Sequence, residues 1–265
     1  MQRRNLLKFL LLEAIAFKCF NLGKAEASTW GYQGEMGTDF WGDIAPEFQT
    51  CSSGQAQSPI NIPTNTPPDI EGSGFTLNVG SLNLNYQDTP LTIVNNGRTI
   101  RVDYQPGSSL TLDGEVYELL QFHFHQPSEH LISGKAEAME AHFVHRHQTT
   151  GDLVVLAVLM AEGKLNQALD SIWQQIPQSN SPTSQVSDLT INALQLLPEN
   201  SRQYYRYQGS LTTPPCSEIV TWLVLKQPVS VSKSQLTRFF AAIGNNARPV
   251  QALNRRSLLQ FDLGN

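Results

Sequence analysis

All six histidines of this 265-residue chain lie between His123 and His147. Two of them, His123 and His125, stand two residues apart in an apolar run that begins at residue 119. Side chains alternate between the faces of an extended strand, so both imidazoles lie on one face and the neighbouring phenylalanines on the other. Two imidazoles on one face of an apolar strand, with further histidines close by, indicate a metal site rather than isolated core histidines.

A second alternating segment, residues 137–145, offers a third ligand. Glu140 and His142 share one of its faces. If this strand pairs antiparallel with the strand of His123, His142 completes a cluster of three neutral imidazoles with an open fourth position, which is typical of a catalytic zinc site. Gln121 and Glu140 each stand two residues before a ligand and on its face, where they can accept the free ring N–H of a neighbouring ligand.

The first 27 residues have the pattern of an export signal. A basic start with Arg3 and Arg4 is followed by an apolar stretch to about residue 22 and by Ala-Glu-Ala at 25–27, a cleavage site of small residues. The paired arginines fit either a twin-arginine signal or an ordinary export signal. The apolar stretch is short and interrupted by charges, so no stable membrane span is predicted. We expect an exported protein in the periplasm, with a lumen or the outside of the cell as alternatives.

Removal of this signal changes the charge and the cysteine count. It takes away five of the 18 basic and two of the 23 acidic residues, which leaves a net charge of −8. No basic patch remains, so nucleic acid is not expected as a partner. Cys19 leaves with the signal, while Cys51 and Cys216 remain as an even pair. We predict a disulfide between them in an oxidising compartment, with two free thiols as the alternative. Nothing in the sequence indicates an oligomeric state.

Residues 28–265 are predicted to form one β-rich domain, since no repeat or long linker divides them. Surface loops rich in Pro, Ser and Asn are predicted at 62–74 and 178–188. Helical spacing predicts helices at 165–175 and 232–243, the second with a capping box at its start and Gly244 at its end. Strands are predicted at 82–87, 91–94, 99–104, 109–112, 118–125, 138–147, 153–161, 203–207 and 219–226. The run at 153–160 is almost wholly apolar, so we expect both its faces to be buried.

Further motifs carry a family resemblance. Ser-Glu-His at 128–130 follows the first histidine pair, and Gly-Ser-Leu-Thr-Thr-Pro-Pro-Cys at 209–216 precedes Val-Thr-Trp-Leu-Val-Leu-Lys at 220–226. Together with the two histidine segments, Trp-Gly-Tyr at 30–32 and Gln-Ser-Pro-Ile-Asn-Ile at 57–62, they closely resemble the α-class carbonic anhydrases. The resemblance covers nearly all of residues 28–265. It implies a β-rich α+β fold, in which a large, mostly antiparallel twisted sheet is surrounded by short helices.

The resemblance also implies an activity and a site. The activity is the zinc-dependent, reversible hydration of carbon dioxide to bicarbonate and a proton, by attack of a zinc-bound hydroxide, with zinc on His123, His125 and His142. Thr212 would lie against the hydroxide and Glu129 behind Thr212. The other implied residues are Gln121, Glu140 and the carbonyl of Asn246, which hold the ligands; Val144, Val155, Leu211, Thr213, Val220 and Trp222, which form the carbon dioxide pocket; and Tyr32, which belongs to the solvent network.

One position departs from the family's fast members, which carry a proton-shuttling histidine after Asn-Gly. Here Arg98 follows Asn96 and Gly97. Arginine stays protonated at any working pH and cannot relay a proton. We therefore expect an enzyme without a histidine shuttle. The plain alternative is that Arg98 is a solvated loop charge while a buffer or another group serves.

Two competing interpretations use the same residues. His123, His125 and Glu129 have the spacing of the first half of a cupin motif, in which the glutamate would be a metal ligand, although a cupin has no need of the Leu-Thr-Thr-Pro-Pro segment. The other alternative is a carbonic-anhydrase-like binding domain without catalysis. Such domains usually lack one or more ligand histidines, and all three are present here.

Overall fold

The structure is a computed structural model that describes residues 29–64, 82–178, 183–199 and 201–262. The predicted export signal, 1–27, lies outside the described residues, as do residues 65–74 of the predicted loop at 62–74. Within the described residues, no helix has the length and apolarity needed to cross a membrane.

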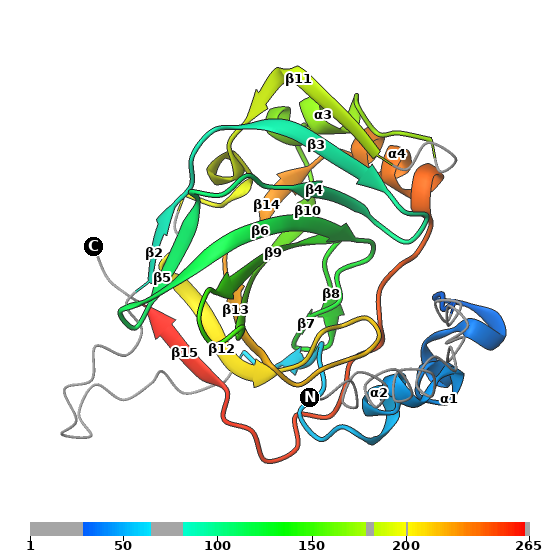
Figure 1. The fold of residues 1–265 in the computed structure, drawn as a ribbon. Coiled ribbons are helices and arrows are strands. Elements are labelled where there is room, and N and C mark those ends of the chain that lie inside the picture. Colours follow the sequence, from blue (N-terminus) through cyan, green and yellow to red (C-terminus); the bar gives the residue numbers. More distant parts are fainter. Residues whose placement is uncertain (1–28, 65–81, 179–182, 200, 263–265) are drawn as a thin grey trace, which may run out of the picture.

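A large twisted sheet of twelve strands forms the body of the molecule, and a small sheet of three strands lies beside it (Figure 1). The strands of the large sheet are β2 (Leu82–Asn85), β3 (Thr89–Asn95), β4 (Ile100–Asp103), β5 (Ser109–Leu112), β6 (Glu115–His125), β9 (Met139–His147), β10 (Leu153–Glu162), β11 (Thr183–Ile191), β12 (Gln203–Gly209), β13 (Val220–Leu225), β14 (Val229–Val231) and β15 (Leu259–Asp262). The small sheet holds β1 (Asn61–Ile62), β7 (Leu131–Ile132) and β8 (Lys135–Ala136).

Four short α-helices accompany the sheets in the described residues: α1 (Trp41–Ile44), α2 (Thr50–Ser53), α3 (Gln167–Trp173) and α4 (Lys233–Ile243). Short 3₁₀ turns lie at Gly34–Met36, Thr38–Phe40, Pro46–Phe48 and Ala193–Leu196. Figure 1 places α1 and α2 together, apart from α3 and α4. The predicted capping box of α4 is present, and Gly244 follows its last residue with a positive φ of 80° that glycine adopts without strain.

The main path of the large sheet runs β11-β3-β4-β6-β9-β10-β13-β12-β15. Most neighbouring strands are antiparallel, as predicted, but β10 pairs parallel with both β13 and β14, so the sheet is mixed. Strand β10 lies between β9 and β13, and its residues 154–160 are buried on both faces. This confirms what the continuous apolar run at 153–160 indicates.

The main core lies on the face of β6 opposite the histidines. Phe122 and Phe124 are fully buried there. The ring of Phe124 packs edge-on against Trp173 of α3 at 4.6 Å between centroids, and against Phe239 of α4 at 6.5 Å. The two helices therefore cover this face, which leaves the other face of β6 for the imidazoles.

The predicted surface loop at 178–188 is wrong over its described part, because Thr183–Ile191 forms strand β11. This strand pairs antiparallel with β3 at the margin of the sheet, and its register shifts between Val186 and Thr190. Among the described strands, β11 pairs with β3 alone, so its residues can be polar. A polar edge strand with an irregularity has the composition of a loop.

A disulfide joins Cys51 of α2 to Cys216, with 5.0 Å between the Cα atoms and a sequence separation of 165. Both cysteines are buried in a small cluster with Trp41. The bridge ties the N-terminal segment, which lies outside the large sheet, to the loop that carries Thr212.

We predict that replacing both cysteines by serine lowers the free energy of unfolding by about 2–5 kcal/mol, because a long closed loop limits the entropy of the unfolded chain. Urea unfolding of the variant and of the oxidised and reduced wild type measures the loss. Titration of two free thiols in the native, purified protein would contradict the bridge.

Candidate metal centre

The register of two neighbouring strands brings three histidines together. Strand β6 pairs antiparallel with β9 so that His123 lies opposite His142, and His125 opposite Glu140. The ring centroids of His123, His125 and His142 are 5.1, 5.3 and 4.6 Å apart. His125 and His142 are buried and His123 is half-buried.

Each of the three rings is held by one of its nitrogens. Nδ1 of His123 bonds to Oε1 of Gln121 over 2.9 Å, Nδ1 of His125 to the carbonyl of Asn246 over 2.8 Å, and Nε2 of His142 to Oε1 of Glu140 over 2.8 Å. Since all three partners are acceptors, each held nitrogen carries the ring proton. The three partners are those that the resemblance implies.

The other three ring nitrogens lie free to accept a metal. One nitrogen from each of His123, His125 and His142 lies within 4.8 Å of the others. Nε2 of His125 is buried and has no hydrogen-bond partner, which is costly unless a ligand satisfies it. Three converging imidazole nitrogens match the donors that Zn²⁺ prefers, so the residues present fit a zinc ion.

Electrostatics keep the three imidazoles neutral. Burial, with the neighbouring histidines next, lowers the pKa of His123 well below its usual value. Burial also lowers the pKa of His142 and brings that of His125 to about 4. Only a neutral imidazole has a lone pair to give, so the site is ready for a metal at neutral pH.

Glu140 connects the site to the next loop. Besides His142, its carboxylate accepts the backbone amides of Glu129 (2.9 Å) and His130 (2.8 Å) and Nδ1 of His130 (2.6 Å). Burial alone would raise the pKa of Glu140, but interactions with His130 and His142 hold it well below its usual value. Glu140 is therefore an ionised carboxylate that fixes one ligand and one loop together.

Glu129 is fully buried beside the histidines. Its Oε1 accepts the backbone amide of Arg248 over 2.8 Å and lies 3.4 Å from Nδ1 of His125. Burial raises the pKa of Glu129 to about 7, against the opposing effects of His142, the Arg248 amide and the side chain of Thr212. Thr212 is itself buried. A bound cation would favour the ionised form of Glu129.

An apolar wall lies on the histidine face of the sheet. Val155 of β10 is opposite Val144 of β9 and, on its other side, opposite Trp222 of β13. The indole of Trp222 packs edge-on against His142, with 4.8 Å between centroids. The predicted pocket residues Val144, Val155, Val220 and Trp222 belong to one buried cluster, and Leu211 packs against it. Thr213 is half-buried, and its carbonyl accepts the amide of Cys216.

Two further predicted residues, Tyr32 and Arg98, both contact Trp30 in the N-terminal segment. The ring of Tyr32 packs edge-on against Trp30 and Trp41, with 5.7 Å between centroids in each case. Arg98 does not extend freely into solvent, because its Nε–H donates to the carbonyl of Trp30 over 2.9 Å. Arg98 is thus half-buried against Trp30 rather than fully solvated, while the expectation that a buffer or another group carries the proton stays a prediction.

Sequence reasoning missed two supports of the site. Arg248 is buried, and its guanidinium donates to the carbonyls of Cys51 and Ser58 and to the side chain of Gln57. His130 was recognised in the sequence only as part of a motif. In the structure its Nε2 is hydrogen-bonded to the hydroxyl of Tyr207 over 2.7 Å. No local sequence pattern indicates these contacts, because the partners are far apart in the chain.

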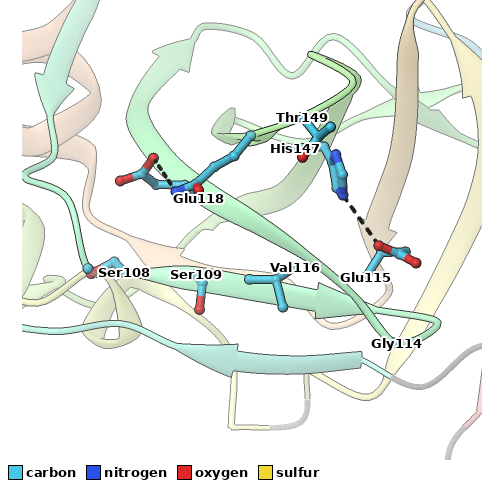
Figure 2. Close-up of a pocket in the computed structure, with 10 residues that line it drawn as sticks. Ser108, Ser109, Gly114, Glu115, Val116, Glu118, His147 and Thr149 are labelled. Carbon is cyan, nitrogen blue, oxygen red and sulfur yellow. Dashed lines mark hydrogen bonds and ion pairs between the residues drawn. The ribbon is translucent and has the colours of Figure 1, made fainter.

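A hollow of about 380 Å³ lies away from the three-histidine site and is lined by residues 107–109, 114–116, 118 and 147–149. Figure 2 shows His147 and Glu115 pointing toward each other across it, 3.3 Å apart, with Ser108, Ser109 and Val116 along its floor. The side chain of Glu115 is 69% exposed and that of His147 19%. His147 belongs to neither of the two groups of metal-ligand type found among the described residues.

Comparisons with known proteins agree with this geometry. Residues 36–261 match the model of the eukaryotic-type carbonic anhydrase family. A carbonic anhydrase of Nostoc sp. is 41% identical over 97% of each chain. The structure of the α-carbonic anhydrase of Thermovibrio ammonificans with sulfanilamide has a TM-score of 0.80 at 40% identity, over 88% of this chain and 99% of that one. A structure of dioscorin complexed with ascorbate has the same TM-score at 32% identity, over 88% and 98%.

The chain therefore belongs to the eukaryotic-type, or α-class, carbonic anhydrase family. Its class of enzyme is carbonic anhydrase, and the family acts on carbon dioxide and bicarbonate.

We predict that the purified protein binds one zinc ion per chain and that His142→Ala lowers zinc occupancy and abolishes hydration, since it removes one of three ligands. Atomic absorption after dialysis measures the zinc. His147→Ala is the matched control, because it removes an imidazole from the same strand outside the site. Full activity in His142→Ala would refute the assignment.

Proposed function

We propose that the protein catalyses the reversible hydration of carbon dioxide at a zinc ion held by His123, His125 and His142. The observation that carries the proposal is that the three free ring nitrogens converge while the other nitrogen of each ring is held by its own acceptor. Bound zinc supplies a positive charge that lowers the pKa of water to about 7, a magnitude taken from carbonic anhydrases as a family and not from this structure.

Thr212 and Glu129 orient the nucleophile. A hydroxyl that donates to an ionised carboxylate has its lone pairs left to accept a hydrogen bond from a water or hydroxide in the site. Glu129 is held in place for this role by the Arg248 amide and by the backbone amide that it gives to Glu140. Glu129 thus sets the direction of the Thr212 hydroxyl, and Thr212 sets that of the attacking oxygen.

The apolar wall holds the substrate. Carbon dioxide has no charge and no hydrogen-bond donor, so a surface of Val and Leu side chains is a suitable holding site. Val144, Val155, Leu211, Val220 and Trp222 provide this surface next to His142. Thr213 completes the pocket on the side of the loop after β12.

Export is part of the proposal. The disulfide is formed in oxidising compartments, so it supports a signal at residues 1–27 and a periplasmic destination. Hydration rate together with zinc content separates this function from its alternatives. A carboxylate ligand to the metal would favour a cupin-like site, and a zinc-loaded protein that hydrates no carbon dioxide would favour a carbonic-anhydrase-like binding domain without catalysis.

We predict that Thr212→Ala and Glu129→Gln retain zinc and lose about 10²-fold in kcat/KM, because they remove orientation and leave the ligands in place. Stopped-flow hydration with a pH indicator measures the rate. Thr212→Ser keeps the hydroxyl and should keep most of the activity. Loss of zinc from Glu129→Gln would identify the glutamate as a ligand instead.

A second prediction concerns proton release. Release of a proton from a group of pKa about 7 is limited by recombination to about 10³ s⁻¹, whereas enzymes with a shuttle reach about 10⁶ s⁻¹. With arginine at position 98, we expect turnover well below the higher value and a strong dependence on buffer concentration, greatest for imidazole-type buffers. Arg98→His should raise kcat at low buffer and leave kcat/KM nearly unchanged. A wild-type rate that is high and indifferent to buffer would contradict this.

A further inference from the structure

Arg98 connects the large sheet to the N-terminal segment through two contacts with one residue. Its Nε–H donates to the carbonyl of Trp30 over 2.9 Å, and its guanidinium carbon lies 4.6 Å from the centroid of the Trp30 ring. A planar guanidinium can donate along its edge and stack over a ring at the same time, which a lysine ammonium cannot do. We call these two contacts the clasp.

On the sheet side, the backbone of Arg98 is fixed to the histidine strand. Oδ1 of Asn96 accepts the amides of Arg98 and Thr99, each over 2.9 Å, which sets the conformation of the turn. Nδ2 of Asn246 donates to the carbonyl of Arg98 over 2.9 Å, and the carbonyl of the same asparagine accepts Nδ1 of His125. A shift of the Arg98 backbone would therefore disturb Asn246 and, through it, the hydrogen bond that holds His125.

On the other side, Trp30 belongs to an aromatic cluster with Tyr32 and Trp41. The three rings pack edge-on, with centroids 5.3 to 5.7 Å apart. Trp41 is fully buried, and its indole N–H donates to the carbonyl of Gly31 over 2.7 Å. The guanidinium of Arg248 lies over Trp41 at 5.6 Å. The cluster is thus anchored by the buried Trp41 and is linked to the sheet through Trp30. Because the Tyr32 ring packs against both tryptophans, they determine its position.

We propose that Arg98 is a positioning residue, whose clasp fastens the aromatic cluster to the histidine strand and thereby fixes the ring of Tyr32. Burial raises the pKa of Tyr32, to which the charge of Glu129 adds and which the charge of Arg98 opposes. Arginine at this position therefore has a structural task that accompanies the loss of a histidine.

The consequence for turnover rests on the proposed function. In the proposed function without a histidine shuttle, protons would leave through solvent, and the family resemblance assigns Tyr32 to the network that orders this solvent. A displaced Tyr32 should slow proton release, which limits kcat, and should leave the preceding hydration step, reported by kcat/KM, nearly unchanged.

The first test concerns the clasp alone and uses the metal-free protein. Amide hydrogen exchange is followed by mass spectrometry in Arg98→Met, Arg98→Lys and Trp30→Leu, with Arg238→Met as control, because Arg238 is exposed on α4. We expect exchange about tenfold faster in peptides covering residues 30–41 for the first three variants, and unchanged exchange in β6. Unchanged exchange at 30–41 in both Arg98→Met and Trp30→Leu would overturn the clasp.

The second test is turnover of the zinc-loaded protein at low buffer. We expect Arg98→Met to lower kcat several-fold with kcat/KM nearly unchanged, and to have no further effect in a Tyr32→Phe background. An undiminished kcat in Arg98→Met, despite faster exchange, would refute the positioning role. Arg98→His lacks the same guanidinium, so comparison with Arg98→Met separates the gain of a proton acceptor from the loss of the clasp. If the wild type hydrated no carbon dioxide, the proposed function would fail while the exchange test would still decide the clasp.

Discussion

The pairing of β6 with β9 is the interaction on which the histidine site depends. It places His123 opposite His142, and a shift by one residue would move every side chain of one strand to the other face. The register is held by the core, because Phe122 lies opposite Phe143 with their rings 5.2 Å apart. Packing on one face of the sheet thus determines the geometry of the metal ligands on the other.

Glu140 extends that geometry beyond the sheet. A buried carboxylate is costly unless its oxygens are satisfied, and here two imidazoles and two backbone amides donate to it. The amide of Glu129 is one of these donors, so the same carboxylate that holds His142 also positions the residue behind Thr212. The orientation of His142 and the position of Glu129 both depend on the buried carboxylate of Glu140. A change in one therefore changes the other.

The sequence predicted the parts of the molecule that follow local periodicity. Alternation separated the imidazoles from Phe122 and Phe124, the apolar run identified a strand buried on both faces, and a capping box located the start of α4. Strand β11 was missed because an irregular edge strand is polar enough to resemble a loop. The contacts of Arg98 and Arg248 could not be predicted, since they join residues that are 68 and up to 197 positions apart and no spacing rule reaches that far.

These long-range contacts explain how an irregular segment can contribute to a precise site. Residues 29–60, the described part of the chain before β1, contribute no strand to the large sheet, and the buried cluster around Trp41, Cys51 and Cys216 is small. Backbone pairing therefore cannot hold it, and side-chain links do so instead: a disulfide, the buried Arg248, and Arg98 at the rim. The sheet thus fixes the three proposed metal ligands and most of the apolar wall, while the linked segment holds the ring of Tyr32. Changes in the segment should then affect proton release more than hydration, because the two steps depend on different parts of the fold.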